Sequence, residues 1–269
     1  MNGNAMITEQ EFSHFQRFIY ESAGITLPSS KKMLVSSRLA RRLQHYEFNT
    51  YSEYFKFLKS GDSKTEIQTA IDLLTTNETY FFREPKHFDL LKEQALAARN
   101  RVQSFRVWSA ACSSGEEAYS AAMVLADSME GTQWDVFGCD ISARVLQRAA
   151  TGHFSMERTK NIPAAYMRRY CLKGIDAQQG TLLIERDLRS KVRFSQVNLN
   201  ETLPDIGMFD IVFLRNVMIY FNDDTKRQVV ERVVSKLKPG GYLLISHSET
   251  LNGISTVVVP VSPSVYRKL

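Results

Sequence analysis

The chain of 269 residues has few cysteines and no long apolar run. Its three cysteines, Cys112, Cys139 and Cys171, form no Cys-x-x-Cys pair, so neither a disulfide framework nor a zinc site is expected. No stretch approaches the ~18 consecutive apolar residues of a membrane span, and the opening MNGNAMITEQEF lacks the pattern of a secretion signal. We therefore expect a cytoplasmic globular protein without membrane insertion.

The three-glycine GxGxxG fingerprint of dinucleotide folds is also missing. In its place stands RVWSAACSSGEEAY (106–119), which predicts a buried strand, a tight turn of small residues and a helix start. A second apolar run ends in GCDIS, with Asp140 at the strand tip, where an acid can accept hydrogen bonds from ribose hydroxyls. Glu116 and Glu117 at the helix start would repel a pyrophosphate. This combination favours S-adenosylmethionine (SAM), which has a ribose, a cationic end and no phosphate, over NAD.

Hydrophobic periodicity predicts a helical N-terminal part followed by an α/β part. Thr8 and Glu11 have capping-box spacing, and further helices are expected over 32–46, 51–59 and 63–74. From Phe105 onward, strand-like and helical runs alternate, which predicts a mainly parallel sheet. TVVVP and SVYRKL predict an antiparallel hairpin at the C-terminal edge, LKPGG is expected to end the last helix, and residues 170–184 predict a small β insertion.

Basic residues gather where acidic ones are missing, since no acidic residue lies between Glu21 and Glu47. On the helix expected over 32–46, basic side chains at i, i+3, i+4 and i+7 lie about 100° from an apolar stripe. This basic stripe consists of Arg38, Arg41, Arg42 and His45. It could bind an acidic partner, and a solvated face is the alternative.

Six collinear segments resemble the CheR family of chemotaxis-receptor methyltransferases, which transfer methyl from SAM to glutamate side chains of bacterial chemoreceptors. The segments are TTNETYFFRE (75–84), RVWSAACSSGEEAYS (106–120), GCDIS (138–142), VNL (197–199), FDIVFLRNVMIYF (209–221) and LKPGGYLLISHSE (237–249). Together with the helical N-terminal part they cover essentially the whole chain in order.

The resemblance implies a fold and a domain plan. The fold is a mainly parallel, Rossmann-like class I methyltransferase sheet with an antiparallel C-terminal edge hairpin and a small β insertion, preceded by an all-helical domain. Residues 1–75 would form the helical receptor-recognition domain, and residues 76–92 a linker that contributes to the active site. Residues 93–269 would form the SAM-binding domain, with the insertion at about 168–192.

The resemblance also implies site residues. The expected cofactor contacts are Asn77, Thr79, Arg83, Glu117, Asp140, Asn198, Leu199, Arg215 and Asn216. Asp140 would bind the ribose, Asn198 and Leu199 would border the adenine, and Arg83 and Tyr220 would act at the reacting carboxylate and the methyl. Arg38, Arg41 and Arg42 would bind the cytoplasmic helices of chemoreceptors, and the insertion corresponds to the region where some relatives bind a receptor C-terminal peptide.

Glutamate methylation fits the side chains that the sequence offers. A glutamate with a reference pKa of about 4.3 is already ionised at neutral pH, so no general base is needed. The site must instead align the oxygen with the methyl and exclude water. His87, His153 and His247 show no metal-ligand spacing, and we expect them to be structural or solvated, with no metal.

Two other functions compete with receptor methylation. Basicity favours an RNA or DNA methyltransferase, but the strand-tip motif is LRNVMIYF rather than an Asp/Asn-Pro-Pro-aromatic box, and no nucleic-acid partner is expected. A SAM-binding adaptor without turnover would lack Arg83 or Tyr220, and both are present. We expect a monomeric protein-glutamate O-methyltransferase.

Overall fold

The computed structural model describes residues 6–61, 64–99 and 101–269 and groups them into two compact units. The helical unit contains the described residues up to Thr76 together with Tyr220–Thr225, and the sheet unit contains Asn77–Ile219 and Lys226–Leu269. Within the described residues, no helix is both long and apolar enough to cross a membrane.

The helical unit is a set of short amphipathic helices around an aromatic core. Its elements are α1 (Glu9–Ala23), η1 (Ser29–Lys31), α2 (Lys32–His45), α3 (Tyr51–Ser60) and α4 (Lys64–Leu74). The capping box predicted for α1 is present, because Thr8 and Glu11 each accept a hydrogen bond from the other's backbone N–H. Fully buried Phe15 contacts the rings of Tyr51 and Tyr54.

A buried ion pair connects α2 to α4. Arg42 donates to both carboxylate oxygens of Glu66, at 2.8 and 2.5 Å, and Tyr54 Oη donates to Glu66 Oε1 at 2.6 Å. Glu66 is 3% exposed. Burial alone would raise the pKa of Glu66, but the bonds from Arg42 and Tyr54 outweigh burial and lower it.

The arginines of the expected basic stripe on α2 differ in their surroundings. Arg42 is engaged with Glu66, and Arg38 donates to the carbonyls of Leu74 and Thr75 at 3.2 and 3.0 Å. Arg41 is exposed. The guanidinium of Arg42 faces Glu66, and its role toward a partner stays a prediction.

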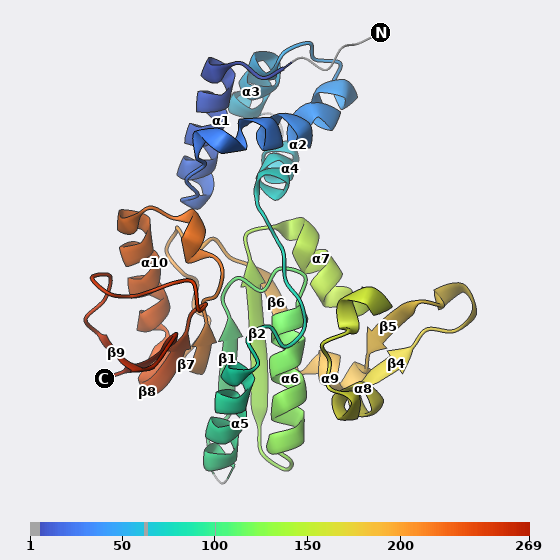
Figure 1. The fold of residues 1–269 in the computed structure, drawn as a ribbon, viewed down its shortest axis with the longest axis vertical. Coiled ribbons are helices and arrows are strands. Elements are labelled where there is room, and N and C mark those ends of the chain that lie inside the picture. Colours follow the sequence, from blue (N-terminus) through green and yellow to red (C-terminus); the bar gives the residue numbers. More distant parts are fainter. Residues whose placement is uncertain (1–5, 62–63, 100) are drawn as a thin grey trace. The chain divides into compact units, whose positions relative to one another are not determined.

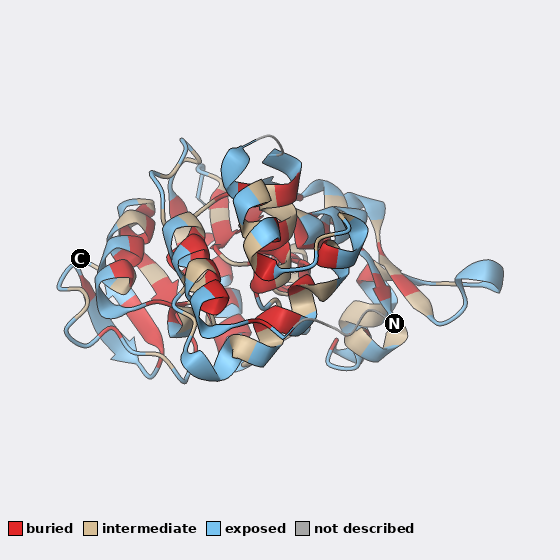
Figure 2. Cartoon of the chain, turned by 90° about the horizontal axis from the view of Figure 1, so that it is seen from above, coloured by how far each residue is buried: buried red, intermediate tan, exposed pale blue. Residues whose placement is uncertain are grey.

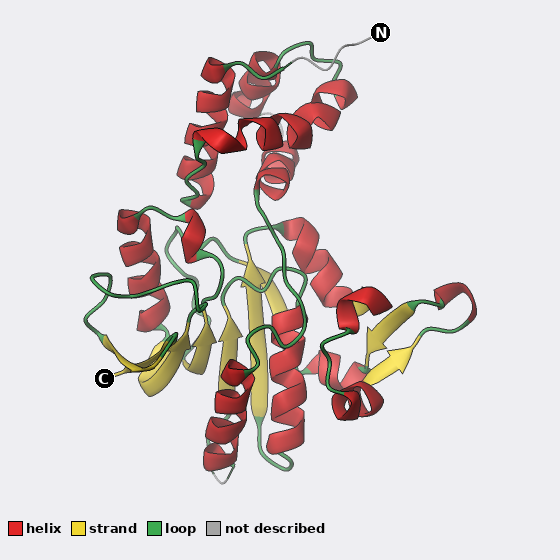
Figure 3. Cartoon of the chain, viewed as in Figure 1, coloured by secondary structure: helices red, strands yellow, loops and turns green. Residues whose placement is uncertain are grey.

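The sheet unit contains seven strands in the order β6-β2-β1-β7-β8-β10-β9 (Figures 1 and 3). They are β1 (Phe105–Ser109), β2 (Trp134–Asp140), β6 (Val192–Gln196), β7 (Phe209–Phe213), β8 (Leu237–Leu244), β9 (Val258–Ser262) and β10 (Val265–Lys268). The strands from β6 to β8 in this order pair in parallel, whereas β10 pairs antiparallel with both β8 and β9. The predicted parallel sheet and its C-terminal hairpin are confirmed.

Helices α5 (Lys86–Ala98) and α6 (Glu116–Ser128) pack side by side on one face of the sheet (Figure 1). Helix α7 (Ala143–Thr151) packs against β2 and β6, and α10 (Asp223–Ser235) connects β7 to β8 along the chain. Figure 2 marks the buried residues in red, and in the central strands Trp108 and Phe213 are fully buried. The strands read as continuous apolar runs because parallel strands are covered on both faces.

The predicted β insertion is a separate three-stranded antiparallel sheet in the order β3-β5-β4 (Figure 3). The expected strand-turn-strand corresponds to β4 (Cys171–Lys173) and β5 (Thr181–Ile184), and β3 (His153–Ser155) adds a strand that the sequence did not reveal. The short helical elements around it are η2 (Met156–Thr159), α8 (Ala164–Tyr170), η3 (Asp176–Gln178) and α9 (Arg186–Ser190).

The expectation that LKPGG ends the last helix is wrong. Helix α10 ends at Ser235, and β8 already begins at Leu237. A Cβ on Gly241 would lie 2.8 Å from the carbonyl oxygen of Asp210 in β7. This glycine is needed inside the strand, where neighbouring backbone comes close.

Candidate functional site

The sheet brings most of the predicted site residues to one edge. Because β1, β2, β6 and β7 are parallel, their carboxyl ends meet there. The turn of residues 110–115 follows β1, Asp140 ends β2, Asn198 follows β6, and Arg215 follows β7. Ligands of open α/β sheets bind at this edge.

Asp140 is held by the turn that follows β1. The backbone N–H of Ser113 donates to Asp140 Oδ2 at 2.9 Å, and that of Ser142 donates to Oδ1 at 2.9 Å. Asp140 is 8% exposed. These two backbone donors, one to each carboxylate oxygen, fix the orientation of the side chain.

The tight turn depends on Gly115, whose φ is +95°. We expect Gly115→Ala to lower the free energy of unfolding by about 2 kcal/mol, because the new Cβ would lie 2.9 Å from Ala149 Cβ and 3.2 Å from Phe194 Cζ. Gly131→Ala is the matched control, since Gly131 also has positive φ (+76°) with nothing within 4 Å. Urea unfolding compares the two, and equal losses would refute the packing argument.

The two glutamates that open α6 have different surroundings. Glu116 is fully buried and pairs with Arg158 of η2, and burial raises the pKa of Glu116. Glu117 instead accepts from Ser109 Oγ at 2.7 Å and from Arg215 at 2.8 Å. The prediction that both carboxylates would repel phosphate is thus wrong for Glu116, which is paired inside the fold.

Arg215 connects three parts of the site. Its side chain is 1% exposed. Nη1 donates to Glu117 Oε2 at 2.8 Å, while Nη2 donates to the carbonyl of Arg83 at 2.5 Å and lies 3.2 Å from Glu84 Oε2. Burial alone would raise the pKa of Glu84, but Arg215 and Ser246 outweigh it and lower that pKa.

Glu249, which the sequence did not single out as a site residue, holds the loop after β7. Its carboxylate accepts from the backbone N–H groups of Asn216 (3.1 Å), Ile219 (3.3 Å) and Ser246 (2.9 Å). Burial raises the pKa of Glu249. Asn216 also donates through Nδ2 to Ser246 Oγ at 2.8 Å. In the sequence, Glu249 could have been noticed because it is the last residue of the matched segment LKPGGYLLISHSE.

The predicted linker residues are fixed through their backbones. Ser113 Oγ donates to the carbonyl of Asn77 at 2.8 Å, and Arg158 donates to that of Thr79 at 3.2 Å. The Arg83 guanidinium lies 5.5 Å from the ring of Tyr80. It forms no ion pair among the described residues.

The remaining predicted residues differ in their links to this network. Asn198 donates to Glu201 at 2.9 Å, and Leu199 is buried. Val197 brings them to the edge by donating to the carbonyl of Asp140 at 3.1 Å. Tyr220 groups with the helical unit, where its carbonyl accepts from the N–H of Thr26 at 2.8 Å, so its catalytic role stays a prediction.

Several site segments hold strained backbone. Phe82, Glu84, Ser113 and Asn216 have φ values of +53°, +56°, +49° and +56°, in the left-handed region that non-glycine residues rarely adopt. Two lie in the segment FFRE, one in the turn after β1 and one after β7.

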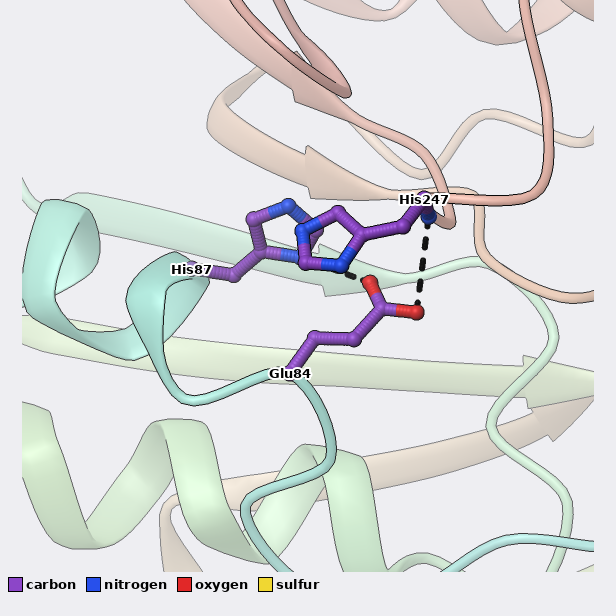
Figure 4. Close-up of side chains that lie close together, drawn as sticks. All are labelled: Glu84, His87 and His247. Atoms are coloured by element: carbon purple, nitrogen blue, oxygen red, sulfur yellow. Dashed lines mark hydrogen bonds and ion pairs between the residues drawn. The ribbon is translucent and has the colours of Figure 1, made fainter.

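Glu84 also belongs to a cluster that the sequence did not predict. Its carboxylate lies beside His87 of α5 and His247, which follows β8 (Figure 4). Burial lowers the pKa of His87 to about 4. The Glu-x-x-His spacing of Glu84 and His87 was a possible signal, but His247 is distant in sequence.

The fold and the site together define a SAM-dependent class I methyltransferase. The strand order, the glycine turn and the buried acid at the tip of β2 suit a nucleoside cofactor, and Glu117 disfavours phosphate at the start of α6. Residues 77–266 match the family profile described as "CheR methyltransferase, SAM binding domain", and residues 10–75 match "CheR methyltransferase, all-alpha domain". The chain belongs to the CheR methyltransferase family.

Characterised relatives agree with this assignment. The chemotaxis protein methyltransferase of Escherichia coli K12 is 39% identical over 258 residues, covering 94% of this chain and 88% of that protein. The chemotaxis protein methyltransferase of Borreliella burgdorferi is 36% identical over 278 residues, covering 99% and 97%. Chemotaxis protein methyltransferase 2 of Pseudomonas aeruginosa is 38% identical over 262 residues, covering 96% and 93%.

Proposed function

We propose that this protein transfers methyl from SAM to glutamate side chains of bacterial chemoreceptors, giving methyl esters for sensory adaptation. The names of the relatives support a substrate in chemotaxis. The observation that carries the choice of a carboxylate acceptor is Arg83. Its guanidinium is partly exposed and forms no ion pair among the described residues, while its own carbonyl is bound by Arg215.

The donor would be held by residues at the carboxyl edge of the sheet. Asp140 would accept from the ribose hydroxyls, and Glu117, oriented by Arg215 and Ser109, would offer a carboxylate to a cationic group. Asn77, Thr79, Asn198, Leu199 and Asn216 complete the proposed set of cofactor contacts. When bound, SAM supplies a methyl group on a positively charged sulfur.

The acceptor needs alignment rather than activation. A glutamate carboxylate is ionised at neutral pH, so one oxygen can attack while the other is held. Arg83 would hold the second oxygen by a charge-assisted hydrogen bond, and Tyr220 would lie near the transferred methyl. Positioning of this kind can remove about 7–11 kcal/mol of a reaction barrier.

Receptor recognition is proposed for two other surfaces. Arg41 on α2 is exposed and would attract acidic receptor helices. The outer strand β4 of the small sheet, with Leu172 51% exposed, and the following Ile175, 73% exposed, would accept an extended receptor C-terminal peptide. We also propose that residues 76–92 act as the linker that completes the active site, and that the protein is a monomer.

A methyl-transfer assay tests the proposed function. Radiolabelled SAM is incubated with the protein and a chemoreceptor cytoplasmic fragment, and the label should appear as an alkali-labile ester that releases methanol. The same fragment with its candidate glutamates changed to alanine is the control. Alkali-stable label would overturn glutamate esterification and favour another acceptor.

Asp140→Ala should weaken SAM binding about 10- to 100-fold, because a charged acceptor for the ribose hydroxyls is lost. Isothermal titration calorimetry measures the affinity. Asp187→Ala, at an exposed aspartate of α9, is the control and should bind normally. Equal affinities of the two variants would remove Asp140 from the ribose site.

A further inference from the structure

Glu84, His87 and His247 offer three ligand atoms that all lie within 4.8 Å of one another (Figure 4). They come from three places in the sheet unit: the segment before α5, the first turn of α5, and the loop after β8. Ring centroids of the two histidines are 5.4 Å apart. The proposed methyl transfer uses neither histidine.

We assign the proton of His87 to one ring nitrogen from the hydrogen bonds around it. His87 is 1% exposed, and its Nε2 lies 2.8 Å from Ser264 Oγ. Ser264 donates its only hydroxyl hydrogen to the carbonyl of Pro263 at 2.6 Å. Because the Ser264 hydrogen is used in that bond, His87 Nε2 is the donor to Ser264 Oγ, and Nδ1 carries a lone pair.

That lone pair faces a carboxylate. His87 Nδ1 lies 3.4 Å from Glu84 Oε2, and neither buried atom has a hydrogen-bond partner among the described residues. On its other side, Glu84 Oε2 is ion-paired with Arg215 Nη2 at 3.2 Å. Two electron-rich atoms in contact repel unless a cation lies against both. Their separation equals the roughly 3.3–3.5 Å between neighbouring ligands of a tetrahedral zinc ion with bonds of about 2.0–2.2 Å.

We propose that this cluster binds one divalent transition-metal ion of the zinc class. His87 Nδ1, Glu84 Oε2 and a ring nitrogen of His247 would be the protein ligands, with water completing the coordination. A set of two histidines and one glutamate suits zinc. His247 is exposed and provides a route of entry from solvent.

Neighbouring hydrogen bonds orient the first two ligands as metal sites require. Ser264 fixes the ring of His87, and Ser246 Oγ donates to Glu84 Oε1 at 2.9 Å, which leaves Oε2 directed toward the histidine. Such outer contacts set the tautomer and direction of ligating side chains. A histidine packed merely as a core residue would not need an unpartnered Nδ1.

Arg215 sets the strength of the site. Its Nη2 lies 3.2 Å from the same Glu84 Oε2, so a bound ion would compete with a guanidinium for this oxygen. We therefore expect reversible binding that is weaker than in a closed structural zinc site.

Titration of the full chain, without a histidine tag, with Zn²⁺ tests the site directly. Calorimetry should show one equivalent, and the Co²⁺ derivative should absorb in the visible range. His247→Ala should lower the affinity at least tenfold, since it removes a ligand at an exposed position where folding is not at stake. His153→Ala, at an exposed histidine of β3, is the matched control and should bind like the wild type.

The titration distinguishes a metal site from its absence without a measurement of catalytic activity. One equivalent that is lost in His247→Ala and kept in His153→Ala supports the site. Absence of a one-equivalent transition, equal affinity of His247→Ala and wild type, or equal loss in both variants would overturn it. Methyl transfer is measured separately, so failure of the metal site leaves the proposed function untouched.

Discussion

Arg215→Met should abolish most of the methyl transfer and lower the free energy of unfolding by about 3–5 kcal/mol. The guanidinium is 1% exposed and contacts Glu117, Glu84 and the carbonyl of Arg83. Methionine fills similar space but leaves both carboxylates without their cation. Loss of alignment between the cofactor side and Arg83 should reduce the methyl-transfer rate at least about 10²-fold.

Arg215→Lys is the control for charge without the planar fork. A lysine can reach one of the three acceptors but cannot bind all of them, so stability should recover in part while activity stays low. Urea unfolding, SAM calorimetry and methyl transfer measure the three effects. If the methionine variant retained the wild-type unfolding midpoint and SAM affinity, Arg215 would be a passive core residue.

Arg42→Ala should destabilise the helical unit by about 3 kcal/mol, whereas Arg41→Ala should change its stability by less than about 0.5 kcal/mol. The two arginines are adjacent on α2, but only Arg42 binds Glu66, which is 3% exposed. Alanine at position 42 removes the cation from a buried carboxylate and leaves it beside the hydroxyl donors of Tyr46 and Tyr54. Far-ultraviolet circular dichroism during thermal unfolding compares the two variants.

The pH dependence of stability provides a second readout. The pKa of Glu66 is lowered in the folded state, so its contribution is fully present above the unfolded value of about 4.5 and is lost as the pH falls through the lowered folded value. Arg42→Ala should shrink this acid-dependent loss. An unchanged acid profile would show that Arg42 does not stabilise the ionised Glu66.

This difference also determines how receptor binding should be tested. Arg41→Glu alone should reduce receptor methylation at low salt and leave SAM affinity unchanged. A double reversal that includes Arg42 would mix lost binding with lost folding. Full methylation by Arg41→Glu at low salt would leave α2 with a merely solvated basic face.

Much of the sheet was predictable because its patterns are local. Alternating apolar runs predicted the parallel strands, and parallel strands bring Asp140 and Arg215 to one edge whatever the intervening helices are. The capping box of α1 needed only Thr8 and Glu11. The segment LKPGG was wrongly predicted to end a helix because Gly-Gly is typical of helix ends. In the structure, Gly241 is required because the carbonyl of Asp210 lies close to it.

Pairings between distant segments could not be predicted in the same way. Successive residues of a helix point about 100° apart, so only one of Glu116 and Glu117 can face the cofactor edge. Arg158, which pairs with Glu116, lies in η2, and β2, α7 and β3 separate η2 from α6 along the chain. The same holds for Glu249, whose acceptor role requires the loop after β7 to fold beside it.

The left-handed backbone at Phe82, Glu84, Ser113 and Asn216 has a consequence for anyone who seeks a more heat-resistant variant. Glycine at such positions would relieve strain of about 1 kcal/mol or more at each residue. The four lie in segments that carry Arg83, the Asp140 contact and the loop bound by Glu249. We therefore expect glycine at these four positions to raise thermal stability and to lower methyl transfer, because the same backbone geometry orients these segments.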